Sequence, residues 1–327
     1  MKLYNVNVSG EQIKKSGKTA LTLLLFIGLV WWVGPDQIVN TIRSAKSHLI
    51  LAAIGTVFFG VIISAGRWTL LLQAKNEQVL FREVFPVYYY GTFSNLALPS
   101  SYGGDVVKAH LMGKNTKNTV NAYSTIFINR IIGLITLISM AVISSIVLIL
   151  INDDLVPYFV YHIVLFLFLL TILGLIMVFS STIQDWITNI ILNSKAFSKI
   201  PYNISNKTES FYNSLRAFRS NTTTVILVFL LSYLFNFVSI LTIYTISSSL
   251  GLQISIWYLF ITIPLIQVIL VVPVTINGYG FREGLYVLFY TPAGISSSEA
   301  VGFSITVSVI TFMTYILGAG FILFIDR

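Results

Sequence analysis

A long apolar region of this chain contains two charged side chains, Arg282 and Glu283. Each could bind a ligand group of opposite charge. They close a motif at 273–284 that also holds helix-breaking residues and an amide: Pro273, Asn277, Gly278 and Gly280. Proline removes a backbone donor, glycine weakens a helix, and a charge at mid-bilayer costs roughly 3 kcal/mol. Broken backbone at membrane depth is tolerated only where protein or a water-filled cavity surrounds it. The motif is therefore a candidate binding site.

A second motif in the first half of the chain has the same pattern. Pro99 is followed by paired glycines, Gly103 and Gly104, and then by Asp105 and Lys108. Two such interruptions, one in each half, are the sequence sign of a transporter's central site. Because the glycines of each motif precede an apolar segment, we expect each motif to begin a short helix.

The chemistry of these motifs favours an anionic ligand. A helix N-terminus presents unpaired amides and a partial positive charge. Arg282 adds a two-pronged donor suited to phosphate oxygens, and Lys108 adds a point charge one turn beyond Asp105. We predict that Arg282, Glu283, Asp105, Lys108, Arg130 and Asn277 bind the substrate. That substrate would be a lipid whose phosphate headgroup enters a hydrophilic crevice while its tails stay in the bilayer.

Structural explanations compete with this prediction. Asp105 and Glu283 could serve only as first-turn helix acids, with Glu283 paired to Arg282. For Asp105 and Lys108 both interpretations stay open, whereas the deeply apolar context favours function for Arg282 and Glu283.

Three further charged residues are interpreted from their positions in the apolar runs. Arg67 lies near the end of one run, so we expect it to snorkel to the interface. Arg130 lies roughly 16 Å into its helix and fits either a site or a snorkelling role. Glu299 follows Ser296 with the spacing of a capping box and is expected to open the last helix.

The composition predicts an all-α membrane protein. Of 327 residues, 56% are hydrophobic and 10% are charged, and the mean hydropathy is +0.84. The net charge of +8 indicates loops that face anionic lipid and does not favour nucleic-acid binding. The absence of cysteine excludes disulfides, and His48, His110 and His162 lack the spacing of metal ligands. No metal or cofactor is expected.

The apolar runs predict a polytopic helical bundle of about six full spans and two re-entrant helical hairpins. The spans are expected at 19–34, 48–72, 120–151, 158–180, 222–248 and 299–325. The interrupted segments 84–112 and 256–292 form the hairpins, and 183–220 is expected to lie on the membrane surface. The first span reads as an uncleaved signal anchor. We expect a single domain over 1–327, with halves 1–180 and 181–327 in an inverted-repeat arrangement.

The basic residues predict the orientation. If both hairpins return to the side they entered from, 15 of the 20 lysines and arginines lie on the side of the N-terminus. Positive charge is enriched in cytoplasmic loops, so the N-terminus is predicted to be cytoplasmic. The hairpin tips near Gly103 and Gly280 would then meet from opposite sides at mid-membrane.

These motifs carry a family resemblance. The strings SNLALPSSYGGDVVKA at 94–109 and PVTINGYGFREG at 273–284 resemble those of the lysylphosphatidylglycerol synthase transmembrane family, also called flippase-like or UPF0104 proteins. The pair Arg67 and Trp68 and the segment from Arg130 to Gly133 are similar to family features as well, while Asn129 stands where relatives often carry an acid. The resemblance implies a multi-pass inner-membrane protein that moves, or helps to move, lipids between leaflets.

Two kinds of function follow. The first is a flippase-like transporter of an anionic phospholipid or a polyprenyl-phosphate-linked glycolipid. The second is a non-transporting membrane partner of a glycosyltransferase or envelope-assembly enzyme. An enzymatic role is not predicted, because the sequence shows no nucleophile–base set, metal-carboxylate cluster or nucleotide loop.

Overall fold

The computed structural model describes residues 45–97, 103–116, 118–150, 164–169, 221–272 and 274–325, with a few isolated positions between 27 and 43 and at 162, 172 and 173. The span predicted at 19–34, apart from Ile27 and Trp31, and the surface stretch predicted at 183–220 lie outside the described residues, as do Pro99 and Pro273. Only a few positions of the span predicted at 158–180 are described.

Long apolar helices form the body of the described chain. These are α3 (Ser47–Gln73), α6 (Thr119–Leu150), α10 (Thr222–Ser249) and α13 (Ser297–Ile316), the last continued by the 3-10 helix η4 (Leu317–Phe324). Each of the four is long and apolar enough to cross a membrane. Their bounds confirm the spans expected at 48–72, 120–151, 222–248 and 299–325. The chain is an all-α polytopic membrane protein.

Four shorter helices form the two hairpins. The first hairpin joins α4 (Phe81–Ala97) to α5 (Gly103–Asn115), and the second joins α11 (Ile256–Ile269) to α12 (Phe281–Tyr290). At about 1.5 Å per residue these helices measure about 15–26 Å, less than the ~30 Å of a hydrocarbon core. None of the four is therefore long enough to cross alone.

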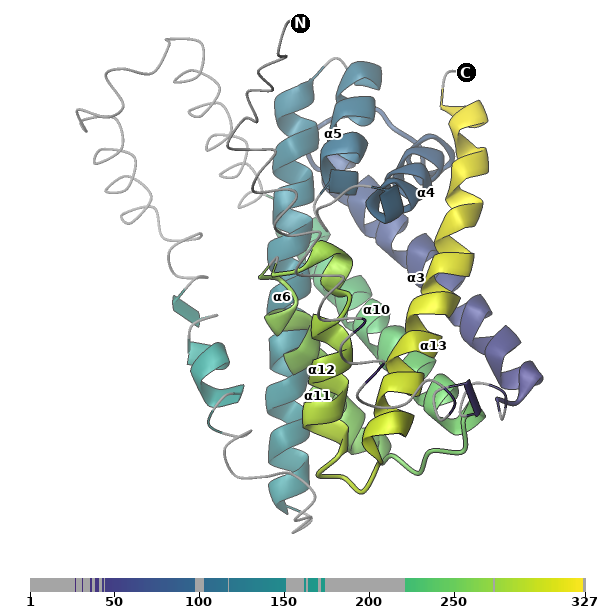
Figure 1. Cartoon of the computed structure of the whole chain (residues 1–327). Helices are drawn as coiled ribbons and strands as arrows, with labels where there is room; N and C mark the ends of the chain where they lie inside the picture. The colour runs from purple at the N-terminus through teal and green to yellow at the C-terminus, as the bar shows by residue number, and fades with distance from the viewer. Residues whose placement is uncertain are drawn as a thin grey trace, which may run out of the picture.

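Each hairpin begins and ends at one end of the bundle. Asn121, at the start of α6, donates to the Glu77 carboxylate over 2.6 Å, so the loop before α4 lies beside the segment that follows α5. In the second hairpin, the Tyr258 hydroxyl near the start of α11 donates to the Phe289 carbonyl near the end of α12. Figure 1 shows α4 and α5 at the upper end of α6, and α11 and α12 beside its lower half. The paired hairpins thus have the opposed arrangement that the sequence predicted.

The interrupted segment 256–292 divides into two helices. α11 ends at Ile269, and a 3-10 turn, η3 (Ile276–Gly278), precedes α12. A proline disfavours the helical conformation of the residue before it and supplies no backbone donor, which explains why the helix ends before 273.

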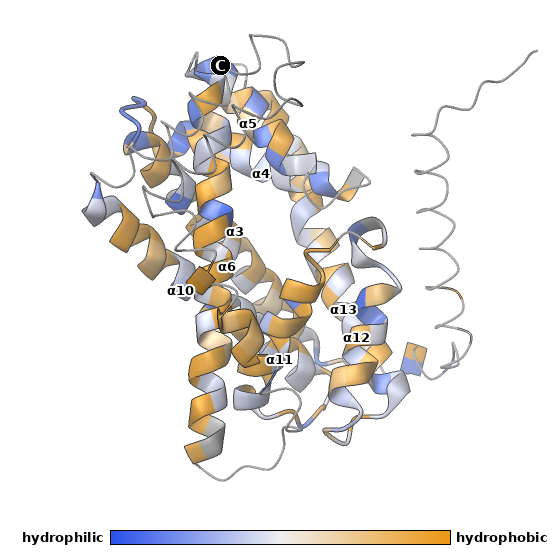
Figure 2. Cartoon of the chain, turned by 90° about the vertical axis from the view of Figure 1, so that its left-hand side faces the viewer, coloured by the Kyte–Doolittle hydropathy of each residue, from blue (hydrophilic) through white to orange (hydrophobic). Residues whose placement is uncertain are grey.

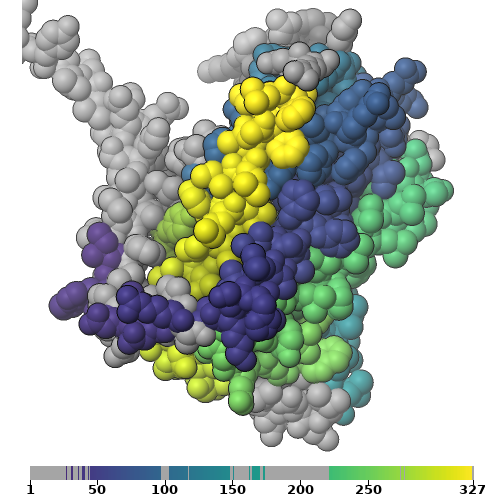
Figure 3. Space-filling view, turned by 90° about the vertical axis from the view of Figure 1, so that its right-hand side faces the viewer, coloured from purple at the N-terminus to yellow at the C-terminus, as the bar shows by residue number. Residues whose placement is uncertain are grey.

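Apolar side chains cover the outside of the bundle, as lipid contact requires. Leu150, Leu230 and Leu323 are 75%, 59% and 73% exposed. Figure 2 shows hydrophobic residues along the length of α6 and over α11, and Figure 3 shows α13 and η4 lying against α3 and α4. η4 approaches α4 closely because Gly318 has no side chain: a Cβ there would lie 2.5 Å from the Tyr89 carbonyl oxygen.

Candidate functional site

A cavity of about 560 Å³ lies between the long helices and the two hairpins. Its lining includes four basic side chains, Arg67, Lys108, Arg130 and Arg282, and one acidic side chain, Asp105. The formal charge of this lining, four cations against one carboxylate, is +3. Cationic and apolar walls in one cavity suit a ligand with an anionic head and apolar tails.

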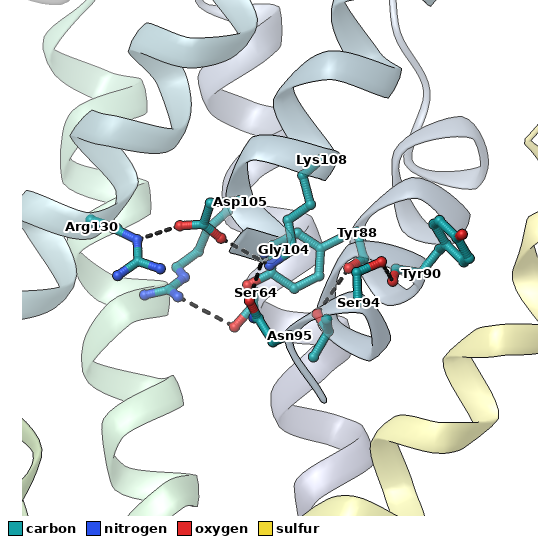
Figure 4. A network of polar contacts seen from close by, with 11 residues as sticks. Ser64, Tyr88, Tyr90, Ser94, Asn95, Gly104, Asp105, Lys108 and Arg130 are labelled. Atoms are coloured by element: carbon teal, nitrogen blue, oxygen red, sulfur yellow. Dashed lines mark hydrogen bonds and ion pairs between the residues drawn. The ribbon is translucent and has the colours of Figure 1, made fainter. Parts of the chain in front are cut away.

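Asp105 connects two of the cations across the first hairpin and α6. Its carboxylate lies 3.2 Å from the Lys108 ammonium and accepts from Arg130 Nε (Figure 4). Lys108 is only 4% exposed, and its ammonium lies 3.9 Å from the centre of the Tyr88 ring. Of the two roles left open for Arg130, its place in the cavity lining and its ion pair with Asp105 favour the site. Its acidic partner comes from α5, although its neighbour in the chain is the neutral Asn129.

Arg67 contradicts the prediction that it snorkels to the interface. It is 5% exposed, lines the cavity, and donates to Ser232 over 2.9 Å and to Ser64 over 3.3 Å. Its guanidinium carbon lies 4.8 Å from the centre of the Phe235 ring on α10. The hydroxyl groups of Ser64 and Ser232 hold it inside the bundle, so it need not reach water.

Arg282 lies at the start of α12, half-buried in the cavity wall. It donates to the Ser308 hydroxyl over 3.0 Å and to the Asn277 carbonyl over 3.1 Å. The turn before it is left-handed: φ is 52° at Asn277, 76° at Gly278 and 78° at Gly280. Glycine and asparagine adopt these angles at least cost, and the turn fixes where α12 and its arginine begin.

Glu283 is fully buried and holds the start of its own helix. It accepts from the Gly280 amide over 2.6 Å and from the Ser304 hydroxyl over 3.1 Å. The alternative in which Glu283 pairs with Arg282 therefore does not describe the structure, and Glu283 lies outside the cavity lining. The capping role expected of Glu299 is confirmed, since it accepts from the Ser296 amide over 2.9 Å.

The tips of the two hairpins meet at Asn95 and Asn277. The side-chain amide of Asn277 donates to the backbone carbonyl oxygen of Asn95 over 3.2 Å. The side-chain oxygen of Asn95 accepts from the backbone amide of Gly104 over 2.7 Å. Asn277 thus links the hairpins and is not part of the cavity lining, whereas Asn95 is. Asn95 was not predicted as a site residue, although it stands as a lone amide four residues before Pro99 in the first motif.

The first hairpin depends on glycines that let its helices touch. α5 begins at Gly103, as the motif predicted. A Cβ on Gly104 would lie 2.0 Å from the Gly91 carbonyl oxygen of α4, and one on Gly91 would lie 2.2 Å from Lys108 Cγ. The close crossing of α4 and α5 places Asp105 and Lys108 beside α6 (Figure 4).

Comparisons with known proteins agree with this architecture. Residues 19–318 match the family model described as the lysylphosphatidylglycerol synthase TM region. A UPF0104 membrane protein of Methanothermobacter thermautotrophicus is 22% identical over 90% of this chain and 89% of its own length. A second UPF0104 membrane protein, from Pyrococcus horikoshii, is 29% identical over 46% of this chain and 41% of its own length. No solved structure matches the chain.

Proposed function

Because the chain belongs to the lysylphosphatidylglycerol synthase TM-region family, we propose that it is a flippase-like lipid transporter of the plasma membrane. It would move an anionic phospholipid or a polyprenyl-phosphate-linked glycolipid between leaflets, with its N-terminus in the cytoplasm.

The cavity charge is the observation that carries this proposal. A lipid phosphate cannot cross the hydrocarbon core cheaply, because a buried unpaired charge costs several kcal/mol. A lining with a formal charge of +3, built on helices that are apolar outside, offsets that cost where the headgroup passes. Since the two hairpin tips meet beside the same cavity, a relative movement of the hairpins is a route by which it could open to one side and then the other.

Liposome reconstitution tests the proposal. The full-length protein is reconstituted with fluorescent phosphatidylglycerol, and a membrane-impermeant quencher reports the fraction of label in the outer leaflet over time. We expect exchange to exceed that of protein-free liposomes and to fall strongly in Arg282→Gln, because the guanidinium at the cavity wall is lost. Arg82→Gln, at an exposed position in the first turn of α4, serves as the matched control and should keep full activity.

A lipid-selectivity measurement separates the two kinds of function. Fluorescent phosphatidylcholine, which has no net charge, should move more slowly than phosphatidylglycerol if the cationic cavity selects the headgroup. Polyprenyl-phosphate lipids are tested in the same way. If no anionic lipid exchanges faster than in protein-free liposomes, transport is refuted, and a non-transporting partner of a glycosyltransferase or envelope-assembly enzyme becomes the better hypothesis.

A further inference from the structure

Two of the four cations in the cavity have no carboxylate partner among the described residues. The ion pairs there join Asp105 to Lys108 and to Arg130, so one carboxylate is shared by two cations. Arg67 and Arg282 are held by neutral groups instead. They present two full positive charges to the same cavity, and neither forms an ion pair with a described acidic side chain.

The Arg67 position has the features of an anion site. Both of its terminal nitrogens donate to serine hydroxyls, and the Phe235 ring lies over its guanidinium. Its Nε is buried and has no hydrogen-bond partner in the described part of the chain. A buried donor without a partner is unfavourable, and an acceptor on a bound ligand would satisfy it.

The Arg282 position is separate from the Arg67 position. Arg282 contacts Ser308 of α13 and the carbonyl of Asn277, whereas Arg67 contacts α3 and α10, and none of these printed bonds is shared. A guanidinium has five N–H donors, so the two bonds of Arg282 leave donors for a ligand. One cavity therefore offers two arginine positions on different helices.

We propose that the lipid held in this cavity carries two phosphate groups in its headgroup, one contacting Arg67 and the other contacting Arg282. This inference rests on the proposed function, because it names the substrate class of the same cavity. Two sources share the chemistry: a prenyl diphosphate, whose phosphates are adjacent, and a phospholipid with two phosphodiesters, whose phosphates are further apart. A headgroup with one phosphate would leave one guanidinium uncompensated, and a headgroup of net positive charge would be repelled.

Two pairs of lipids test the proposal by equilibrium binding to the purified full-length protein. Farnesyl phosphate and farnesyl diphosphate share one tail and differ by one phosphate, while phosphatidylglycerol and cardiolipin compare one and two phosphodiesters. The two-phosphate member of at least one pair should bind about tenfold more tightly, the size expected of one added charge-assisted contact. The pair that shows the preference identifies the source.

Substitutions of the two arginines test whether each arginine position binds one of the phosphates. Arg67→Gln and Arg282→Gln should each lower the affinity for the preferred two-phosphate lipid to about that of its one-phosphate counterpart in the natural protein. Arg82→Gln should not change it. Thermal unfolding checks that each variant is folded, and Arg67→Lys, which keeps the charge, replaces Arg67→Gln if the latter does not fold.

Equal affinities within both pairs would overturn the inference, as would a preference that survives both glutamine variants. Failure of the proposed function is distinguishable, because transport would then be absent from liposomes while the binding preference remained.

Discussion

At the start of α12, two charged neighbours make different contacts. The Glu283 carboxylate accepts from the Gly280 amide and the Ser304 hydroxyl, while the Arg282 guanidinium contacts Ser308 and lines the cavity. Their adjacency in sequence suggests a pair, but successive residues on a helix do not face each other. The buried acid thus fixes the helix start, and the arginine remains available to a ligand.

This separation makes a prediction about Glu283. Glu283→Gln should lower the apparent unfolding temperature in detergent, because a neutral amide cannot accept both bonds equally well. An unsatisfied buried group costs about 1–3 kcal/mol. Glu299→Gln alters a capping glutamate whose bonds lie at an exposed position and should cost less, so it is the matched control. Lipid binding by the folded Glu283→Gln protein should be nearly unchanged; a selective loss of binding without loss of stability would place Glu283 in the binding site instead.

Asp105, unlike Glu283, lines the cavity and contacts two cations that also line it. Asp105→Asn removes the shared carboxylate and raises the formal charge of the lining from its present +3. We expect a loss of stability on the order of 2 kcal/mol, because the buried Lys108 loses its ionic partner. Added phosphatidylglycerol should restore part of the unfolding temperature by supplying an anion.

The control for Asp105 is Asp36→Asn, at an exposed position. Unfolding temperatures are compared with and without lipid for both variants. If Asp105→Asn unfolds like the unchanged protein, its ion pairs contribute nothing measurable.

At the scale of elements, the α4–α5 crossing is the contact most sensitive to volume. Gly104→Ala should separate the two helices, since the new Cβ would lie 2.0 Å from a backbone oxygen of α4. Overpacking typically costs about 1–3 kcal/mol, and the shift would also displace Asp105. We expect lower stability and lost lipid exchange in liposomes.

Gly55→Ala in α3 is the matched control, because nothing lies within 4 Å of the added Cβ. It adds the same methyl group to a helix of the same bundle. Equal activity and stability in the two alanine variants would show that the crossing tolerates expansion.

The positions of the long helices could be predicted from the sequence, because a segment that crosses lipid must be a helix of about 20 mostly apolar residues. Apolar runs gave α3, α6 and α10 within about one or two residues, and paired glycines gave the start of α5. The end of α11 at Ile269 was not predicted, since residues 270–272 are as apolar as the helix itself. Hydropathy does not distinguish a helix from a turn that is buried in protein.

The site was predicted less completely, because its residues depend on contacts between distant helices. Charge inside apolar runs indicated Asp105, Lys108, Arg130 and Arg282, all of which line the cavity. Whether Arg67 reaches water or stays inside depends on Ser232, far along the chain on α10, and no local pattern reveals that neighbour. The bond between Asn95 and Asn277 is non-local in the same sense.

At the scale of the whole molecule, the two hairpins enter the bundle from opposite ends. The loop before α4 is bonded to the start of α6, and the beginning of α3 is bonded to the end of α10 through Lys46 and Ser249 at 2.9 Å. One end of the bundle therefore carries the base of the first hairpin, and the other end carries the base of the second. The distribution of lysine and arginine predicts that the end with the base of the first hairpin faces the cytoplasm.

Thiol labelling in cells tests that orientation, and the cysteine-free chain allows single cysteines to be introduced without a background. Asn115 and Thr291 are exposed positions at the bases of the two hairpins, and replacing them removes no charge. Because positive charge is retained in the cytoplasm, we expect Asn115→Cys to resist an impermeant reagent in intact cells and to react after permeabilisation. Thr291→Cys should react in intact cells. The reverse labelling pattern would mean that the molecule has the opposite orientation in the membrane. Labelling of both cysteines in intact cells would mean that one hairpin crosses the membrane fully.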